Sequence, residues 1–450
     1  MKRSLCLVLC LLLVCGCNKK EKLQYAAPLL IPDTQRQMKS PGFWISRQAN
    51  PDKLILDAQE ISELNFRIQH KLKLTRDLKK LGAGFSGKEL KALLESDFQN
   101  LAKEKLYFAG GNRAGKDFYR TARERMGISA IPAQVIVRYG FTLAYADQRL
   151  LPAAEVLSAE PGDLEFDELQ NSSLDIATPL AVLQESKDGS WVYALAPSSS
   201  GWVRKDKVAF CSFADFESAF YQDKAAVVIS AKTDIFWDVA MTRYYDYVRM
   251  GSVFRYIAPV DYKTAMVMIP FQDAAGKFYF CPAYINKQDL SIGYLPYTPR
   301  MIIIQAFKLL NAPYGWGGVN GEQDCSSFLQ EIFSTVGINL PRNSADQGKV
   351  GELIGDFHSK PGNQKKAQIL VKQGLGGITI LQLKGHILLY LGKSGRRFYA
   401  IHETHGYGQK EWHGTVARIL NRVAVTDLLL GKGSKKGSLI ERIVAIRIIK

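Results

Sequence analysis

Residues 314–329 read YGWGGVNGEQDCSSFL, and this stretch decides how the C-terminal part of the chain is interpreted. Its glycines interrupt a preceding helical pattern and let the backbone approach a ligand closely. After Cys325, apolar residues recur at helical spacing: Phe328, Leu329, Ile332, Phe333 and Val336. We therefore expect Cys325 at the N-terminus of a helix, with Asp324 or a neighbour as the cap.

The expected position of Cys325 suits a nucleophile. Exposed amides and the positive end of a helix dipole lower the pKa of a thiol, most of all beside a histidine, and the same amides can hold an oxyanion. A lone cysteine is more often a buried apolar residue, so the functional interpretation depends on a base. His386 is the candidate for that base.

His386 opens an apolar run that passes through Gly-rich turn residues at 392–395 into a second run ending at His402, which predicts a β-hairpin. If Leu391 pairs with Arg397, His386 faces His402 directly, and a register one residue tighter puts it beside Ile401. A polar group at the distal ring nitrogen fixes the tautomer of a catalytic base. We expect His402 to supply that group.

His405 is the competing candidate for the third residue, but two following glycines place it in a turn rather than on the strand. A zinc site is not expected here. The segment His402-Glu403-Thr404-His405 lacks the two-residue gap of the His-Glu-x-x-His motif, and His413 falls in a different segment.

The rest of the chain has the composition of ordinary globular proteins. Its 450 residues are 47% hydrophobic and 23% charged, and at roughly 150 residues per domain they suggest about three domains. From residue 42 to 127 the pattern is helical, with Asn50-Pro51 as one helix start and Ser86 with Glu89 as a capping box at another. We expect a helical N-terminal domain over 42–127.

Residues 128–295 alternate short apolar runs with Gly, Pro, Asp and Ser, as small barrels do. The clearest hairpin joins strands at 178–183 and 191–196 through Asp188-Gly189. Aromatic and glycine positions around it are typical of a bacterial SH3-like barrel. We expect one such barrel at 128–212, a more divergent one at 213–295, and an α+β domain at 296–450.

Most aromatic residues of the barrels are expected to fill their cores. Tyr139 and Tyr145, near the entry to the first barrel, are the two candidates for substrate contacts. Cys211 and Cys281 either form a disulfide or are buried free thiols, and their strand-like surroundings favour free thiols. With three cysteines after the leader, the body is not a disulfide scaffold.

Residues 1–17 have the pattern of a signal peptide, with two basic residues, an apolar run and Val14-Cys15-Gly16-Cys17. The run is about half of the roughly 20 residues that a helix needs to cross a bilayer, so a permanent anchor helix is the weaker alternative. The last four residues resemble a bacterial lipobox, which would make Cys17 the lipid-modified N-terminus. A polar leader at 18–41 would then tether an exported body to an envelope membrane.

A net charge of +16 indicates acidic partners, and both nucleic acid and the anionic bacterial envelope qualify. The basic residues are scattered among acidic ones, without the interleaved Arg and aromatic residues of single-strand binders. Export favours the envelope, and we expect no nucleic-acid partner.

Four segments together resemble the signature of the NlpC/P60 peptidase family. They are Tyr314-Gly-Trp-Gly-Gly318, Asp324-Cys-Ser-Ser-Phe328, Leu340-Pro-Arg-Asn-Ser-Ala-Asp-Gln347 and Gly385-His-Ile-Leu-Leu-Tyr-Leu-Gly392. They cover about the last third of the chain, and the barrels resemble the tandem SH3-like modules of the family's cell-wall-recycling members. The resemblance implies a papain-like fold with a Cys325, His386 and His402 triad that needs neither metal nor cofactor.

The resemblance also implies a substrate: the bond between γ-D-glutamate and the L-diamino acid of peptidoglycan stem peptides. Residues expected at the cleft are Asp324, Ser326, Arg342, Ser344 and Asp346, to which we add Tyr314 and Tyr145. A barrel that walls off one end of the cleft would favour released peptides with a free N-terminal L-alanine. We expect a monomer.

Two other functions remain open from the sequence. One is a wall-binding scaffold with an inactive peptidase domain, against which the intact cysteine and histidines argue. The other is an acyltransferase or amidase, because a fold does not fix its substrate.

Overall fold

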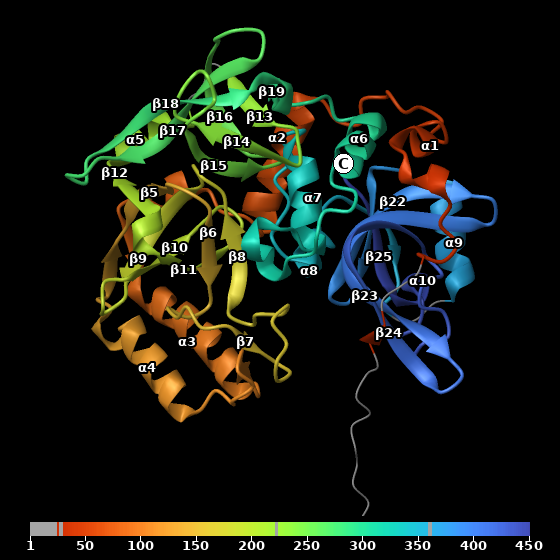
Figure 1. Cartoon of the computed structure of the whole chain (residues 1–450), viewed down its shortest axis with the longest axis horizontal. Coiled ribbons are helices and arrows are strands. Elements are labelled where there is room, and N and C mark those ends of the chain that lie inside the picture. Colours follow the sequence, from red (N-terminus) through yellow and green to blue (C-terminus); the bar gives the residue numbers. More distant parts are fainter. Residues whose placement is uncertain (1–24, 27–29, 221–223, 359–361) are drawn as a thin grey trace, which may run out of the picture.

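The computed structural model describes residues 25–26, 30–220, 224–358 and 362–450, and within them the chain forms three seven-stranded sheets. Figure 1 shows two of these sheets on one side of the molecule and the C-terminal sheet on the other, with α7 (Cys325–Ser334) between them. The chain is a mixed α/β multidomain protein. In the described residues, no helix is long and apolar enough to cross a membrane.

The C-terminal sheet has the strand order β1-β24-β23-β22-β21-β25-β20. Its strands are β1 (Tyr25–Ala26), β20 (Glu352–Asp356), β21 (Thr379–Leu383), β22 (His386–Ser394), β23 (Arg397–Glu411), β24 (Gly414–Asp427) and β25 (Ile443–Ile448). The helices α6 (Pro299–Lys308) and α7 share one apolar core with one face of this sheet. The helices α9 (Asn363–Gln373) and α10 (Leu439–Arg442) pack on the other face.

The first β domain has the order β12-β5-β9-β10-β11-β6-β8. Its strands are β5 (Arg138–Thr142), β6 (Ala146–Arg149), β8 (Gln170–Leu174), β9 (Pro179–Glu185), β10 (Trp191–Leu195), β11 (Ser200–Arg204) and β12 (Val208–Cys211). The predicted hairpin is confirmed, because β9 and β10 pair antiparallel around a turn with Gly189 at φ 71°. Glycine favours that left-handed conformation.

The second β domain has the order β15-β14-β18-β17-β16-β13-β19. Its strands are β13 (Ala225–Val228), β14 (Lys232–Phe236), β15 (Tyr244–Arg249), β16 (Val253–Pro259), β17 (Thr264–Gln272), β18 (Phe278–Asn286) and β19 (Leu290–Ile292), after the short helix α5 (Phe213–Ser218). Cys211 and Cys281 are free and half-buried.

Two small sheets in the described residues have two strands each. In one, β2 (Gly84–Ser86) pairs with β4 (Gln134–Ile136), and in the other, β3 (Tyr107–Phe108) pairs with β7 (Leu157–Ser158).

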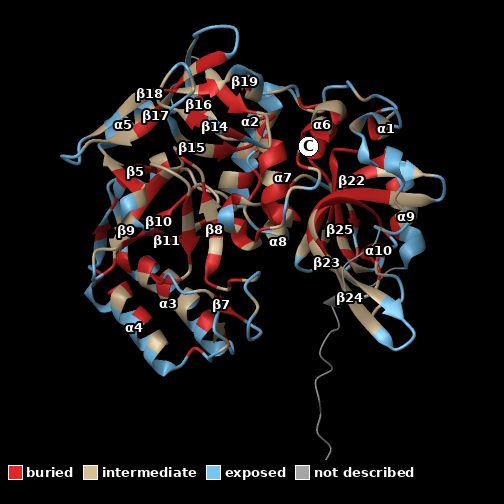
Figure 2. Cartoon of the chain, in the orientation of Figure 1, coloured by how far each residue is buried: buried red, intermediate tan, exposed pale blue. Residues whose placement is uncertain are grey.

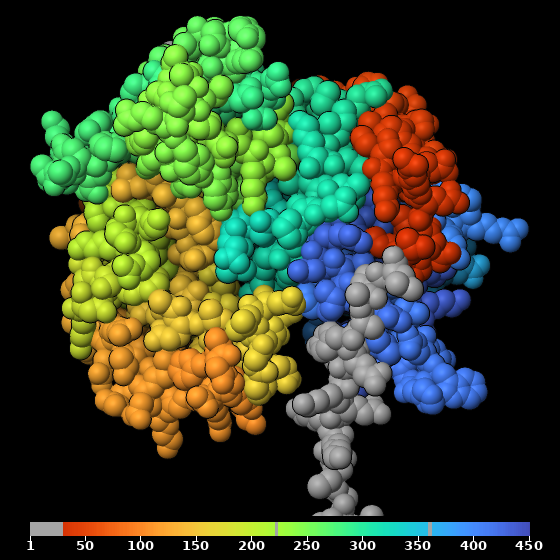
Figure 3. All heavy atoms as spheres, viewed as in Figure 1, coloured from red at the N-terminus to blue at the C-terminus, as the bar shows by residue number. Residues whose placement is uncertain are grey.

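The helices of the segment 42–127, expected as one domain, join two different apolar cores. The cores divide them: α1 (Pro41–Ile45) and α2 (Ala58–Phe66) pack with the C-terminal sheet, whereas α3 (Gly87–Lys103) and α4 (Lys116–Met126) pack with the first β domain. Figure 3 shows the N-terminal residues lying against the C-terminal domain. An amphipathic helix buries its apolar stripe wherever a complementary face lies, and sequence periodicity does not identify that face.

Two local expectations for these helices had different outcomes. Ser86 caps α3, since its hydroxyl accepts from the amide of Glu89. The helix expected to begin at Pro51, with Asn50 as its cap, begins seven residues later, at Ala58, where Asp57 and Glu60 form a capping box. A side chain that accepts from the first-turn amides fixes the start better than a proline at the first position.

Part of the range expected for the leader, 18–41, contacts the C-terminal domain. From Asp33 onward it packs there: Met38 is buried, Arg397 pairs with Asp33, and the Thr34 hydroxyl donates to the carbonyl of Val425. The expected signal peptide with Cys17, and residues 18–24 and 27–29, lie outside the described residues.

A buried charge cluster joins the three parts of the molecule. Arg249 of β15 donates to Asp175, which follows β8, with Nη2 to Oδ2 at 2.8 Å, and its Nη1 lies 3.7 Å from Glu331 Oε1 of α7. The guanidinium is 5% exposed. Removing one partner from such a cluster leaves a buried charge without compensation, which is costly. Because the three residues come from the two β domains and α7, the cluster holds both β domains against the helix that carries Cys325.

Candidate active site

Cys325 is the first residue of α7, and Asp324 is its N-cap, as predicted. Asp324 Oδ1 accepts from the amides of Ser326, at 3.0 Å, and Ser327, at 2.9 Å, while the Ser327 hydroxyl accepts from the Asp324 amide at 2.8 Å. These bonds give hydrogen-bond acceptors to backbone amides at the helix start that have no partner within the helix. They hold the backbone around the thiol in one conformation.

Arg342 locks this cap from outside the helix. Its guanidinium donates to Asp324 with Nη2 to Oδ2 at 2.7 Å, to the Ser326 hydroxyl at 2.9 Å and to the Ser172 hydroxyl of β8 at 3.0 Å. Burial by itself raises the pKa of the Asp324 carboxyl, but the charge and hydrogen bonds of Arg342 and the cap amides hold that pKa at about 2. Asp324 is therefore a permanent anion, and both it and Ser326 are engaged structurally.

His386 and His402 form a hydrogen-bonded chain that ends on a threonine. His386 Nε2 lies 2.8 Å from His402 Nδ1, and His402 Nε2 lies 2.8 Å from the hydroxyl oxygen of Thr426 in β24. His402 and Thr426 are both fully buried. If Thr426 accepts from His402 Nε2–H, then His402 Nδ1 accepts from His386 Nε2–H, and His386 keeps an unprotonated Nδ1. That is the tautomer a general base needs.

The hairpin reaches this geometry by a register that differs from both expected ones. Ser394 pairs with Arg397 across a two-residue turn, and a bulge at Leu391 shifts the register so that Leu389 pairs with Ile401. His386 and His402 are thus diagonal neighbours on one face, not directly opposite. Long side chains still meet at a diagonal position. A bulge adds one residue to one strand, and the sequence carried no sign of it.

The thiol and imidazole are neutral at rest. Burial raises the pKa of Cys325 to about 12, assisted by the nearby charge of Asp324, although the Ile387 amide donates to the thiol and opposes the rise. Burial lowers the pKa of His386 to about 4, assisted by the charge of Arg442. The helix start was expected to lower the thiol pKa, and here burial is the larger effect. Proton transfer from thiol to imidazole then belongs to the attack itself.

The glycine-rich stretch brings the first β domain against the site. Gly317 and Gly318 have positive φ, and a Cβ on Gly318 would lie 2.0 Å from the Ser173 hydroxyl oxygen. This close approach requires glycine. The Tyr145 hydroxyl oxygen lies 2.8 Å from the Gly318 carbonyl oxygen, so Tyr145 lies at the site. Tyr139 does not, because its hydroxyl donates to the Gly82 carbonyl beside α5.

His405 lies away from the histidine chain. It pairs with Glu165 of the first β domain, and its ring meets Phe166 edge-on at 4.8 Å. Phe166 also contacts Tyr314, at 6.0 Å between centroids, and Trp316, at 5.3 Å. Tyr314 therefore lies at the seam between the two domains. Burial raises its pKa far above the usual range, so its hydroxyl stays protonated.

The two remaining cleft candidates lie on α8 (Ser344–Gln347). Ser344 is half-buried at its first position. Asp346 is already paired, accepting from Asn343 Nδ2 at 2.7 Å and from Lys349 Nζ at 2.6 Å. The charge of Asp346 is thus balanced by Lys349 within the same segment.

Sequence reasoning missed three polar residues at the site. Thr426 ends the histidine chain, and Asp147 of β6 accepts from the Tyr145 hydroxyl and from Gln170 Nε2, both at 2.8 Å. Glu403 is fully buried, and neither carboxyl oxygen has a partner in the described residues. Burial raises its pKa to about 10, which keeps it neutral beside Asp324. None lies in a recognisable motif, although an acidic residue directly after His402 was a visible signal.

In the described residues, no group of three or more His, Cys, Asp or Glu side chains is arranged to hold a metal ion. Asp324, His386 and His402 instead have hydrogen-bond partners in the protein. What the arrangement offers chemically is a thiol at a capped helix start, an oriented imidazole and a neutral tyrosine hydroxyl.

Comparison with known proteins agrees with this geometry. Residues 311–409 match the NlpC/P60 family, and residues 157–204 match an SH3 domain of the SH3b1 type. Over 100 residues the chain is 34% identical to the gamma-D-glutamyl-L-lysine dipeptidyl-peptidase of Bacillus subtilis, covering 21% of this chain and 30% of that protein. Over 64 residues it is 41% identical to the probable endopeptidase p60 of Listeria monocytogenes, covering 14% and 13%.

A solved NlpC/P60 endopeptidase from Photobacterium damselae subsp. piscicida matches across 94% of this chain and 100% of its own, with a TM-score of 0.74 at 19% identity. That likeness concerns the fold. The sequence matches span less than a third of either curated relative. The chain contains an NlpC/P60 domain and an SH3b domain, and the NlpC/P60 domain is of a peptidase family.

Proposed function

We propose that this protein is a cysteine endopeptidase that cuts the γ-D-glutamyl-L-diamino acid bond of peptidoglycan stem peptides, with Cys325, His386 and His402 as its catalytic triad. The hydrogen-bonded chain from His386 to Thr426 beside a capped cysteine carries the proposal. The printed name of the Bacillus relative, a gamma-D-glutamyl-L-lysine dipeptidyl-peptidase, supports the choice of bond.

The reaction follows from these groups. The Cys325 sulfur attacks the γ-carbonyl carbon of D-glutamate while His386 Nδ1 takes the thiol proton. The imidazolium then gives that proton to the departing amine of the diamino acid, leaving a thioester. Water, deprotonated by His386, attacks the thioester and releases the carboxylic acid and the thiol.

The oxyanion needs donors that the cap has not used. The amides of Ser326 and Ser327 donate to Asp324, so they are not free for a substrate oxygen. The amide of Cys325 itself and the neutral hydroxyl of Tyr314 are the donors we assign. This assignment replaces the general expectation that the first-turn amides act together.

The first β domain supports a preference for a free N-terminal L-alanine. Tyr145, Gln170 and Ser172 of that domain contact the glycine stretch or Arg342, and we assign this domain to one end of the substrate site. Asp324 and Asp346 are neutralised by their cations. Asp147, whose neighbours in these bonds are neutral, is the carboxylate we assign to the substrate ammonium.

We further propose that the protein is exported and held at an envelope membrane through a lipid on Cys17. The pattern of residues 1–17 supports this location.

The test is product analysis on L-Ala-γ-D-Glu-diamino acid peptides carrying either diaminopimelate or lysine. Cys325→Ala should abolish cleavage while the fold is retained, and Asp147→Asn should reduce kcat/KM for the free-amine peptide more than for its N-acetylated form. Cleavage that survives Cys325→Ala would contradict the nucleophile. Transfer to a second amine in place of hydrolysis would identify an acyltransferase.

A further inference from the structure

One exposed tryptophan lies at the tip of the longest hairpin. Trp412 is 94% exposed between β23 and β24, and residues 410–414 around it are all exposed. Figure 2 shows this tip as an exposed end of the C-terminal sheet. An isolated exposed apolar residue is common, so Trp412 needs further observations before it indicates a partner.

Lysines surround the tip. The loop that follows β24 lies along the hairpin, because the Lys435 amide donates to the Thr415 hydroxyl at 3.1 Å and Gly433 lies against the Lys410 side chain. Exposed basic residues of this loop and the tip are Lys410, Lys432, Lys435 and Lys436. The two nearby carboxylates are occupied: Glu411 by Arg418, and Glu441 by the amide and hydroxyl of Ser438. The surface therefore combines an exposed tryptophan with nearby exposed lysines.

Strand β1 lies beside the tip end of β24. Tyr25 and Ala26 pair in parallel with Ala417 and Arg418, so Tyr25 is the end of β1 that is nearer the tip. Ala417 is three residues from Gly414, or roughly 10 Å along the strand. Cys17 is eight residues before Tyr25, which limits their separation to about 29 Å. An anchor at Cys17 would hold the tip near the membrane.

We propose that the Trp412 tip and its lysines dock onto the surface of the anionic phospholipid bilayer that holds the N-terminus. Tryptophan favours the bilayer interface, and lysines are attracted to anionic headgroups. A single acyl chain with a polybasic patch binds a membrane more stably than either alone. Docking at the tip would fix the orientation of the enzyme and not only its distance from the membrane. The inference rests on the anchor proposed above, and not on the bond that is cleaved.

The test uses the full chain reconstituted through its N-terminus into vesicles of phosphatidylethanolamine and phosphatidylglycerol with brominated acyl chains. Bromine quenches nearby tryptophan emission, and Trp412 is one of six tryptophans, so the signal is the difference between wild type and Trp412→Phe. We expect emission to fall in wild type and this fall to be lost in Trp412→Phe. Replacing Lys432, Lys435 and Lys436 with Gln should weaken the quenching on anionic vesicles.

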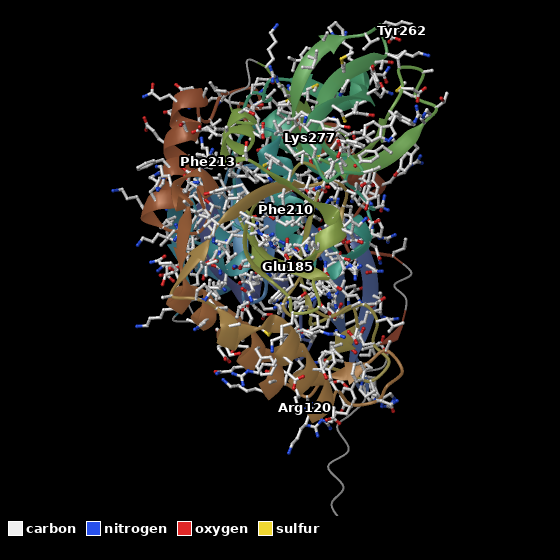
Figure 4. All side chains as sticks on the ribbon, turned by 90° about the vertical axis from the view of Figure 1, so that its left-hand side faces the viewer. Arg120, Glu185, Phe210, Phe213, Tyr262 and Lys277 are labelled. Atoms are coloured by element: carbon white, nitrogen blue, oxygen red, sulfur yellow. The ribbon has the colours of Figure 1, made fainter. Side chains whose placement is uncertain are left out.

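The control moves a tryptophan to the other end of the molecule. Tyr262, labelled at the top of Figure 4, is 81% exposed in the turn between β16 and β17 of the second β domain. Figure 1 shows that domain at the opposite end of the molecule from the tip of β23 and β24. Tyr262→Trp in the Trp412→Phe background should show no quenching. Equal quenching of wild type and Trp412→Phe would overturn the inference, as would attachment to isolated wall polymers without lipid quenching. Protein that does not stay with the vesicles would instead overturn the anchor, and peptide hydrolysis in the same vesicles reports on the proposed function separately.

Discussion

Replacing Thr426 with Val tests the hydrogen-bonded chain that orients His386. Valine keeps the shape of threonine, so packing is preserved, but His402 Nε2 loses an acceptor at 2.8 Å in a fully buried position. A buried N–H left without a partner costs about 1–3 kcal/mol. His402 either bears that cost or moves its proton to Nδ1, where it meets His386.

The second response disables the base. With a proton on His402 Nδ1, His386 Nε2 has to accept, and His386 then carries its own proton on Nδ1, the nitrogen that should take the thiol proton. Regaining the productive tautomer then costs up to about 1–3 kcal/mol, which corresponds to a fall in rate of up to roughly 5- to 150-fold. We expect kcat/KM to fall within that range.

The assay is kcat/KM for hydrolysis of L-Ala-γ-D-Glu-diaminopimelate, measured across pH. Thr426→Ser keeps the hydroxyl and should retain most of the activity. Thr379→Val is the matched control, because Thr379 is also fully buried in this sheet but its hydroxyl accepts from the Leu375 amide. Thr426→Val with wild-type kcat/KM, or a loss shared equally by Thr379→Val, would refute the reasoning.

Three further predictions concern charge and burial. Burial lowers the pKa of His386 to about 4, so the imidazole stays unprotonated well below its usual pKa. The acid limb of the pH profile of kcat/KM should therefore have an apparent pKa below ~6.5. An acid limb at or above that value would contradict the role of His386 as the base. The pKa of Glu403 is about 10 in the folded chain and lower in the unfolded chain, so its contribution to stability is lost as pH rises from about 4.5 towards 10. Glu403→Gln should make the midpoint of thermal unfolding fall less steeply over this pH range. At pH 8 the midpoint should rise by about 2–4 °C for each kcal/mol recovered. Arg249→Met should lower the free energy of unfolding in urea by about 3–5 kcal/mol, since it leaves the half-buried Asp175 carboxylate without its cation; a change within ~0.5 kcal/mol would show that the cluster does not hold the domains together.

Local sequence patterns were sufficient for the central features of the site. Helical spacing after residue 325 and an acidic residue before it predicted the capped helix start, and two apolar runs around a Gly-rich turn predicted the hairpin that carries both histidines. The turn residues Asp188-Gly189 likewise predicted the hairpin of β9 and β10 in the SH3b domain. Each of these features depends on residues a few positions apart, where propensity and turn chemistry act.

Contacts between distant segments decided the rest. The bulge at Leu391 set the histidine register, and Thr426 and Asp147 reached the site from strands that carry no motif. The N-terminal helices divided between two cores because the faces that cover them belong to domains far along the chain.

The electrostatics of the site also depended on the assembled protein. A helix start predicts a lowered thiol pKa, yet burial beneath the sheet and the first β domain raises the pKa of Cys325 and lowers that of His386. The sequence by itself determined which residues we propose as the catalytic set, because helix starts, turns and strand alternation are local. Only the tertiary structure decided how they are oriented and charged, because desolvation and hydrogen bonding depend on which distant segments surround each group.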